Sequence, residues 1–475
     1  MKNNKFFNDN LMHHSRRQFL RHALYGCGSL ALGSSSFAAN ASQLHLAGAK
    51  LQQASHARRG FDDYKALVCI FLYGGNDAFN MVVPTSSTEY NDYKSARQGL
   101  ALEQSSLLAL GKHNNVDYGL HPAMAGLKNL FDTKKMALLA NVGALVEPVS
   151  QIAYQQNKVL LPPQLFSHND QQIYLQSLQS ASKPTGWLGR AGDLLMSAND
   201  NQQLSMNISL SGNNIMQAGQ NVFPYSMDAS GVNMLSRLNN DSTEQTELNR
   251  AAVYQRILQQ QRSHLFTRHF ANTQQRAWAL ASTVNDALAV TSPITTPFPA
   301  ENSLAMSLKM IGQMIAARGN LNVSRQTFFI GIGDFDTHGD QVNRQPALFS
   351  MLDEAITAFY AATVELGMEN QVTTFTASDF GRTLSSNGDG TDHGWGSHQL
   401  MVGGAVTGGQ IFGNMPTLAL NSPDDIGEGR IIPTTSMDQY GATLGRWFGL
   451  QESDMADVYP NLHNFNRSDL GFMGA

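Results

Sequence analysis

The sequence predicts an α/β fold built on a doubly wound, mostly parallel sheet that carries a helical or irregular insertion. Apolar runs with the length of buried strands alternate with amphipathic stretches along most of the chain. Several runs are apolar on both faces, as central parallel strands are. Three of them end in glycine-rich loops with Asp or Asp and His, where open α/β sheets place their ligand sites.

Composition sets limits on the class of protein. The chain has 475 residues, of which 42% are hydrophobic and 15% charged, so it can bury a sizeable core. A net charge of -5 without a basic stripe argues against nucleic acid as the main partner. Only two cysteines occur, and Cys27 lies in the N-terminal segment described next. Cys69 would then have no partner for an internal disulfide.

Residues 1–38 are predicted to be a twin-arginine signal peptide. The run Ser15-Arg16-Arg17-Gln18-Phe19-Leu20 precedes a short apolar segment and the small residues up to Ala39. We place the cleavage after Ala38 or a few residues later. The prediction is a periplasmic or secreted protein that uses the twin-arginine translocation machinery and has no stable membrane span after cleavage. An ordinary amphipathic helix start is the alternative.

The remaining chain is predicted as a polar leader over 39–64 and a single domain over 65–475. Its first strand covers 66–73 and ends in Gly74-Gly75-Asn76-Asp77. A helix over 121–134 and a strand over 136–142 follow. Near Ser167 another helix begins, with Ser167 or Asn169 as its N-cap.

An insertion is expected near 186–300. It begins with a stretch rich in Gly, Asn, Ser and Met that carries a short strand over 203–210, and continues as a helical region over 240–287. The later elements are a helix over 302–318, a strand over 326–332, a helix over 346–366, a strand over 371–377, a glycine-rich hairpin or edge region over 398–413, and a helix over 437–450.

Polar residues at the strand ends suggest a metal site. Asp77 follows the first strand, Asp336 and His338 follow the strand over 326–332, and Asp379 follows the next one. Asp336 and His338 are two residues apart, so on an extended segment both side chains point the same way. Carboxylates and imidazoles from successive strand ends are suitable ligands for a divalent cation. His393, next to Asp392, is a further candidate.

Each candidate also has an ordinary structural interpretation. Asp77 could simply cap a turn or helix. Arg382 could bind an anionic group, or pair with Asp379 in a structural salt bridge. Ser167 beside a metal could act as a nucleophile. It could equally be only an N-cap, with His168 on the surface or touching the site. Asn76 could hold an ester oxygen or support Asp77.

The motifs together resemble a known family. In order, they are Gly74-Gly75-Asn76-Asp77, Leu120-His121-Pro122-Ala123, Ser167-His168, Phe335-Asp336-Thr337-His338, Asp379-Phe380-Gly381-Arg382-Thr383 and Asp392-His393-Gly394. Behind a twin-arginine signal this order is similar to domain-of-unknown-function family 1501, from about Ala66 to Gly413. The family is placed in the alkaline-phosphatase-like superfamily, with sulfatases, phosphodiesterases and phosphomutases. The resemblance therefore implies an alkaline-phosphatase-like fold.

The resemblance also implies a site with one or two metal ions. It assigns Asp77 and Asp379 to one ion, and Asp336, His338 and His393 to the other. Zn²⁺ suits the mixed N and O ligands, and Mn²⁺ or Ca²⁺ the carboxylate-rich half. Ser167 is the implied nucleophile, with Arg382 and Asn76 steadying the ester oxygens. The superfamily often has Asp-His where this chain has Asp379-Phe380, so one imidazole is missing.

Two functions follow as expectations. The first is an exported metal-dependent hydrolase of a phosphate, phosphodiester or sulfate ester, acting on a small anionic ester or an envelope polymer. The second is a non-catalytic envelope binding or assembly protein on a degenerate alkaline-phosphatase-like fold. The altered Asp379-Phe380 motif and the weak sequence context of Ser167 motivate the second.

Overall fold

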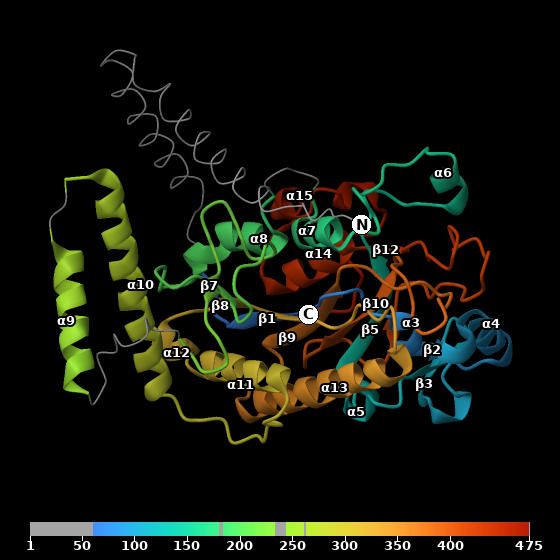
Figure 1. The fold of residues 1–475 in the computed structure, drawn as a ribbon, viewed down its shortest axis with the longest axis horizontal. Helices are drawn as coiled ribbons and strands as arrows, with labels where there is room; N and C mark the ends of the chain where they lie inside the picture. Colours follow the sequence, from blue (N-terminus) through green and yellow to red (C-terminus); the bar gives the residue numbers. More distant parts are fainter. Residues whose placement is uncertain (1–59, 180–183, 233–243, 261–262, 475) are drawn as a thin grey trace, which may run out of the picture. The chain divides into compact units, whose positions relative to one another are not determined.

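A nine-stranded sheet forms the centre of the computed structural model, which describes residues 60–179, 184–232, 244–260 and 263–474 (Figure 1). The predicted signal peptide and most of the predicted leader lie outside the described residues. Along the sheet the strands follow the order β11-β5-β10-β9-β1-β8-β6-β7, and β12 pairs with β5. The strands are β1 (Lys65–Leu72), β5 (Met136–Gly143), β6 (Asn207–Ser209), β7 (Tyr225–Ser226), β8 (Arg325–Ile332), β9 (Val372–Ser378), β10 (Ser397–Val402), β11 (Ile411–Phe412) and β12 (Thr435–Ser436).

The sheet is parallel apart from one strand. β1 pairs in parallel with both β8 and β9, and β6 continues the parallel arrangement beyond β8. β10 runs antiparallel to β9 and to β5. The prediction of a doubly wound, mostly parallel sheet is therefore confirmed. The prediction that 398–413 forms a hairpin or edge was wrong for β10, which lies between two strands and is buried along its length.

Helices cover both faces of the sheet (Figure 1). One layer contains α5 (Ala125–Asp132), α11 (Ser303–Ala316), α12 (Arg318–Leu321) and α13 (Gln341–Glu365). The opposite layer contains α7 (His168–Ser177), α8 (Trp187–Leu195), α14 (Met437–Phe448) and α15 (Met455–Val458). Successive side chains of β1 point to opposite faces, so Val68 and Ile70 join one core cluster, and Leu67 and Cys69 the other.

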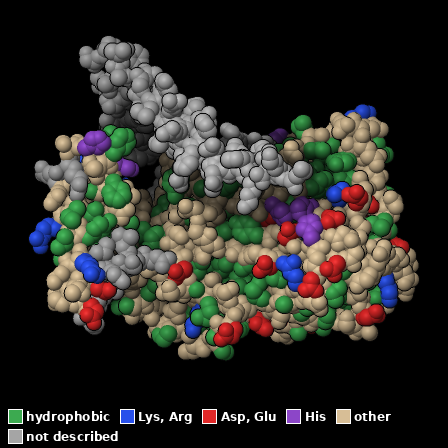
Figure 2. Space-filling model, viewed as in Figure 1, with side chains coloured by type: hydrophobic (Ala, Val, Ile, Leu, Met, Phe, Trp, Pro, Cys, Tyr) green, Lys and Arg blue, Asp and Glu red, His purple; other side chains and the backbone are tan. Residues whose placement is uncertain are grey.

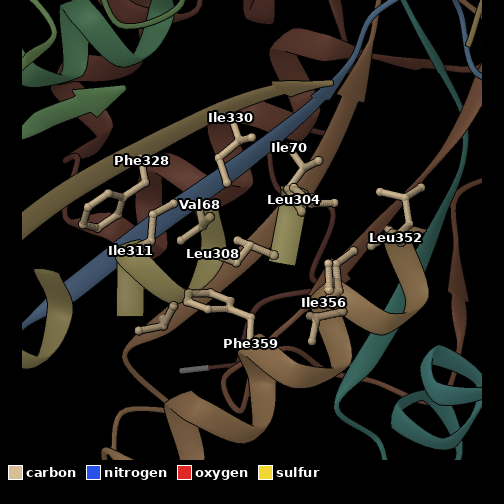
Figure 3. Packing of buried hydrophobic residues seen from close by; sticks show 14 of the residues in the cluster. Val68, Ile70, Leu304, Leu308, Ile311, Phe328, Ile330, Leu352, Ile356 and Phe359 are labelled. Carbon is tan, nitrogen blue, oxygen red and sulfur yellow. The ribbon is translucent and has the colours of Figure 1, made fainter. Parts of the chain in front are cut away.

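The first of these clusters is shown in Figure 3. Val68 and Ile70 of β1 and Phe328 and Ile330 of β8 pack against residues of α11 and α13. By length and composition alone, α13 would be able to cross a membrane. Its residues Leu352, Ile356 and Phe359 are instead part of this core (Figure 3). α13 is thus a core helix, and its apolar character reflects burial between the sheet and neighbouring helices.

A second, three-stranded sheet was not predicted. It has the antiparallel order β2-β4-β3, formed by β2 (Val82–Pro84), β3 (Leu108–His113) and β4 (Val116–Leu120). The helix α4 (Ser87–Arg97) follows β2. These elements matter for the site, because Arg97 at the end of α4 turns back toward the carboxyl end of β1.

The region predicted as an insertion contains both sheet and helix. β6 pairs with β8, and the helical region predicted over 240–287 consists of two helices, α9 (Gln245–Gln259) and α10 (Leu265–Ala289). The remaining short helices are α3 (Ala78–Met81) and α6 (Gln151–Gln155), with 3-10 turns at Gln98–Leu100, Gln104–Ser106, Met196–Ala198, Glu452–Asp454 and Leu462–Asn464.

Candidate metal centre

The loops that follow β1, β8 and β9 are bonded to one another at the carboxyl edge of the sheet. The backbone N–H of Gly74 donates to Asp379 Oδ2 at 3.1 Å, and Arg382 donates to the Gly74 carbonyl at 3.1 Å. Gly74 has φ +114°, and a Cβ there would lie 2.3 Å from the backbone nitrogen of Asp336. Only glycine allows this approach. The first strand-end loop thus fixes the positions of Asp336 and Asp379.

Three side chains from different segments converge at this edge. His168 begins α7, Asp336 follows β8, and His393 lies in the loop after β9. One ligand atom from each lies within 4.8 Å of the other two, so the group could hold a metal ion. Arg382 and His393 form an isolated antiparallel bridge, which folds the loop after β9 back toward Asp336. Figure 2 shows histidine and acidic side chains gathered together at the surface.

His338 adds a fourth ligand candidate. Its Nε2 atom lies 3.1 Å from Asp336 Oδ1 and 3.0 Å from His393 Nε2. The other spacings are 3.6 Å from His393 Nε2 to Asp336 Oδ1 and 3.6 Å from His168 Nε2 to Asp336 Oδ2. Ligands placed about 2.0 Å from a tetrahedral zinc ion lie about 3.3 Å apart. The observed spacings bracket that value.

Outer partners engage the Nδ1 atom of each imidazole. His393 Nδ1 lies 2.7 Å from the carbonyl of Phe166, which can only accept, so this nitrogen carries the hydrogen. His338 Nδ1 faces Asp392 Oδ1 at 3.0 Å, and His168 Nδ1 faces Asp379 Oδ2 at 2.7 Å. Carboxylates likewise accept. With Nδ1 engaged in this way, each ring turns its Nε2 atom toward Asp336.

The positions of the Nε2 atoms suit a cation. Those of His338 and His393 lie 3.0 Å apart, close to the spacing of two ligands on one zinc ion. The Nε2 atom of His168 is buried and has no hydrogen-bond partner. Buried polar atoms normally have a partner, and metal-bound histidines normally give their other N–H to a carboxylate or carbonyl. The donor set therefore fits a divalent cation bound by nitrogen and oxygen.

Charges around the cluster shift the pKa values of its members. The hydrogen bond from His168 to Asp379 raises the pKa of His168, although burial acts in the opposite direction. Burial lowers the pKa of His393. For Asp336, burial favours the protonated acid, but the hydrogen bond and charge of Arg382 outweigh it and lower the pKa. The carboxylate of Asp336 is thus held in its charged form.

Arg382 holds Asp336 of the cluster in place through an ion pair. Its side chain is buried, donates to Asp336 Oδ1 at 2.6 Å, and binds the backbone carbonyls of Thr391 and Gly74. The salt bridge that the sequence suggested for Arg382 is formed with Asp336 and not with Asp379. The guanidinium orients a ligand candidate and keeps it ionised.

The carboxylate of Asp77 is engaged by residues outside the histidine cluster. It forms a buried ion pair with Arg97, accepts from Gln341, and caps α3 through the N–H of Phe79. Asp379 is buried and accepts from His168, Gln172 and Gly74 through one oxygen, Oδ2. The structure therefore brings Asp336, His338 and His393 together directly, with Asp379 behind His168. The partners of the Asp77 carboxylate are Arg97, Gln341 and the N–H of Phe79.

Ser167 and Asn76 occupy different surroundings. Ser167 is the N-cap residue of α7, but its hydroxyl donates to Asp170 Oδ2 at 2.6 Å and not to a backbone N–H. It lies between Phe166 and His168, which both contact the cluster. Asn76 is buried, its Nδ2 atom contacts Met81 Sδ, and its Oδ1 atom has no partner.

Two functional side chains, His168 and Arg97, were not predicted from the sequence. His168 was considered only as a residue on the surface or touching the site, yet it belongs to the group that could hold a metal. Its position directly after a strand-to-helix loop, in the Ser167-His168 motif, was the available signal. Arg97, by contrast, ends a polar helix and nothing in the sequence around it indicates a buried ion pair.

Fold and cluster together define an α/β protein with a histidine-rich candidate metal centre at the carboxyl edge of its sheet. Residues 64–459 match the family described as "Protein of unknown function (DUF1501)". The chain belongs to this family, as its motifs predicted. A search of curated proteins finds no match.

Solved structures with a similar fold include sulfatases, phosphoethanolamine transferases and an alkaline phosphatase. The PsFucS1 sulfatase from Pseudoalteromonas sp. is 9% identical with a TM-score of 0.33, covering 91% of this chain and 74% of that one. The soluble domain of lipooligosaccharide phosphoethanolamine transferase A from Neisseria meningitidis is 8% identical with a TM-score of 0.32, covering 86% and 95%. A mutant of alkaline phosphatase PafA is 12% identical with a TM-score of 0.27, covering 68% and 64%. These likenesses concern the fold alone.

Proposed function

We propose that this chain is an exported metal-dependent hydrolase of a phosphate, phosphodiester or sulfate ester. The observation that carries the proposal is the convergence of three imidazole Nε2 atoms on the carboxylate of Asp336. The proposed location is periplasmic or secreted, reached through the twin-arginine machinery. The proposed substrate is a small anionic ester or an ester group on an envelope polymer.

The proposed ligands are His168, Asp336, His338 and His393, around one divalent cation. Zn²⁺ suits three imidazoles and one carboxylate best. When bound, such a cation supplies positive charge that polarises an ester oxygen and favours a deprotonated nucleophile. Asp77 stays outside this ligand set, because Arg97 and Gln341 occupy its carboxylate.

Behind the ligands, three groups hold the imidazoles in place. Asp379 orients His168, Asp392 orients His338, and the Phe166 carbonyl orients His393. Such outer partners make an imidazole more basic and fix its direction. Arg382 does the same for Asp336. We therefore propose that Arg382 holds a ligand, and its role at the ester oxygens stays a prediction.

Ser167 is the proposed nucleophile. Its hydroxyl hydrogen already points to Asp170 Oδ2 at 2.6 Å, so Asp170 would take the proton as the serine oxygen attacks the phosphorus or sulfur atom. The ester oxygen of the leaving group would depart, and water would then release the covalently bound acid. The α7 N-terminus at Ser167 favours negative charge on the attacked group. Attack by water alone is the competing route.

The second function, a non-catalytic binding or assembly protein, also has an observation behind it. A four-ligand zinc site without an open position is normally structural. Against this, the side chains of Asp336 and His338 are each 44% exposed, so solvent reaches one side of the cluster. That access favours the hydrolase.

Protein prepared without chelator distinguishes the two functions. We expect about one equivalent of metal, and turnover of p-nitrophenyl phosphate, bis-p-nitrophenyl phosphate or p-nitrophenyl sulfate. An Asp336→Ala, His338→Ala double variant should lose both metal and turnover. Asp334→Ala, on a side chain that is 86% exposed in the same loop, is the matched control. Ser167→Ala should retain the metal and lose turnover.

Three results would argue against the proposal. A protein that contains no metal, and whose thermal stability does not change when chelator is added, supports the non-catalytic binding function. Bound metal without turnover of any ester class supports a structural site. Unchanged turnover in Ser167→Ala removes the serine from the mechanism and leaves attack to water.

A further inference from the structure

The helical hairpin formed by α9 and α10 has an exposed apolar surface near its turn. The two helices contact each other through Tyr254 and Trp278, whose ring centroids are 5.9 Å apart, and through buried Leu258 and Ala271. At the other end of α10, Val284 and Ala287 belong to the main core cluster. The hairpin is thus attached to the core at one end of α10.

Large side chains in the first turns of α10 are not buried by either helix. Phe266 is 74% exposed, Leu265 63% and Phe270 59%. Phe266 and Phe270 are four residues apart, so they lie on the same side of the helix. Every residue from 263 to 270 is exposed. Figure 2 shows hydrophobic side chains at the surface of this hairpin, next to basic and histidine side chains.

The charge of this region differs from that of the chain as a whole. The complete chain has 37 acidic and 32 basic residues, yet no Asp or Glu occurs from 248 to 285. The same stretch contains Arg250, Arg256, Arg262, Arg268 and Arg276, together with His264 and His269. The exposed aromatic residues therefore lie in a positively charged environment.

We propose that the tip of the α9–α10 hairpin, defined by His264–Phe270, binds the surface of a membrane that contains anionic phospholipid. Exposed aromatic and aliphatic side chains enter the boundary between headgroups and acyl chains, while arginines beside them attract anionic headgroups. A soluble polyanion would pair with the arginines but would leave Leu265, Phe266 and Phe270 in water. A lipid surface accounts for both features, and this inference is independent of the metal centre.

Vesicle sedimentation of the purified protein tests the proposal. We expect binding to vesicles of phosphatidylglycerol and phosphatidylcholine, and at least tenfold weaker binding to phosphatidylcholine alone. Raising the salt to 0.5 M should weaken the binding because surface charge attraction is screened. A Phe266→Ser, Phe270→Ser double variant should bind at least tenfold less. Arg268→Glu should reduce binding to the anionic vesicles only.

Phe223→Ser is the matched control, since Phe223 is an exposed aromatic residue outside the hairpin. It should bind vesicles like the wild type. Circular dichroism confirms that the variants keep their helices. Absence of vesicle binding by the wild type overturns the proposal, as does equal binding by the double variant. A dimer in solution that the double variant abolishes, without vesicle binding, assigns the tip to a second copy of the chain and also overturns it.

Discussion

At the scale of single residues, the account depends on His168. The sequence presented it as a neighbour of Ser167, but the structure places its ring 4.3 Å, centroid to centroid, from that of His393. Its role was not predictable, because a histidine at the start of a helix is compatible with many surface positions. Only the fold reveals that Asp379, more than two hundred residues away in sequence, accepts from its Nδ1 atom.

His168→Gln tests its role directly. We expect the affinity for Zn²⁺, measured by calorimetry, to fall by at least tenfold, because one ligand is lost. Asp379→Asn should reduce the affinity by about 10- to 100-fold, since it removes the group that orients His168. His463→Gln, at an exposed histidine whose Nδ1 lies 2.9 Å from the Pro460 carbonyl, should bind zinc normally. Normal affinity in His168→Gln would exclude this residue as a ligand.

Asp438 predicts a pH dependence of stability. It is buried in α14, where it accepts from Asn461 at 3.0 Å and lies near Arg190, Tyr174 and Tyr459. Burial raises the pKa of Asp438 from 3.8 to about 7. As the pH rises above about 4, the unfolded chain loses this proton before the folded protein does. The contribution of Asp438 therefore destabilises the fold progressively between pH 4 and 7.

Replacing this carboxyl with an amide should remove the effect. Asp438→Asn keeps an oxygen that can accept from Asn461 and has no charge to bury. Denaturation at pH 8 should show a variant more stable than the wild type by up to about 4 kcal/mol, and at pH 4 little difference. Asp457→Asn, at an exposed position, should change neither. Equal stability curves for Asp438→Asn and the wild type would mean that the carboxyl is not buried in the folded protein.

At the scale of elements, the buried strands were the most predictable part. The predicted strands over 66–73, 326–332 and 371–377 lie within about one residue of β1, β8 and β9. These strands could be predicted because they are apolar on both faces, and such runs are typical of a parallel sheet that helices cover on both sides. β10 was misjudged since glycines after it suggested an edge, and β2, β3 and β4 are too short and polar to be recognised without their partners.

The second element-scale feature is the link between α4 and the end of β1. Arg97 and Asp77 are both fully buried and paired. Arg97→Met should destabilise the protein by about 3–5 kcal/mol, because it leaves the carboxylate of Asp77 buried without its cation. An Asp77→Asn, Arg97→Met double variant should recover part of the loss. Lys94→Met, which removes an exposed pair with Glu103, should cost about 0–1 kcal/mol.

The same variants test whether Asp77 is a metal ligand. Because Arg97 occupies its carboxylate, we expect the Asp77→Asn protein to retain its full metal content. Loss of metal in this variant, with intact folding by circular dichroism, would restore the ligand role that the family resemblance implied for Asp77.

At the scale of the whole molecule, the fold brings together residues that the sequence scatters from 166 to 393. The doubly wound sheet could be predicted, and with it the expectation that strand-end residues meet at one edge. What could not be predicted is which of them meet. Asp336, His338 and His393 do, whereas the carboxylate of Asp77 pairs with Arg97 at the end of α4, the helix between β2 and β3. Which strand-end residues meet depends on how segments that are distant in the sequence pack together.

Anomalous X-ray scattering at the zinc edge, from crystals grown with Zn²⁺, tests the central claim most directly. A single strong peak is expected about 2.0–2.1 Å from the Nε2 atoms of His168, His338 and His393 and from a carboxylate oxygen of Asp336. A peak between Asp77 and Asp379, or no peak beside the histidines at saturating zinc, would contradict the account.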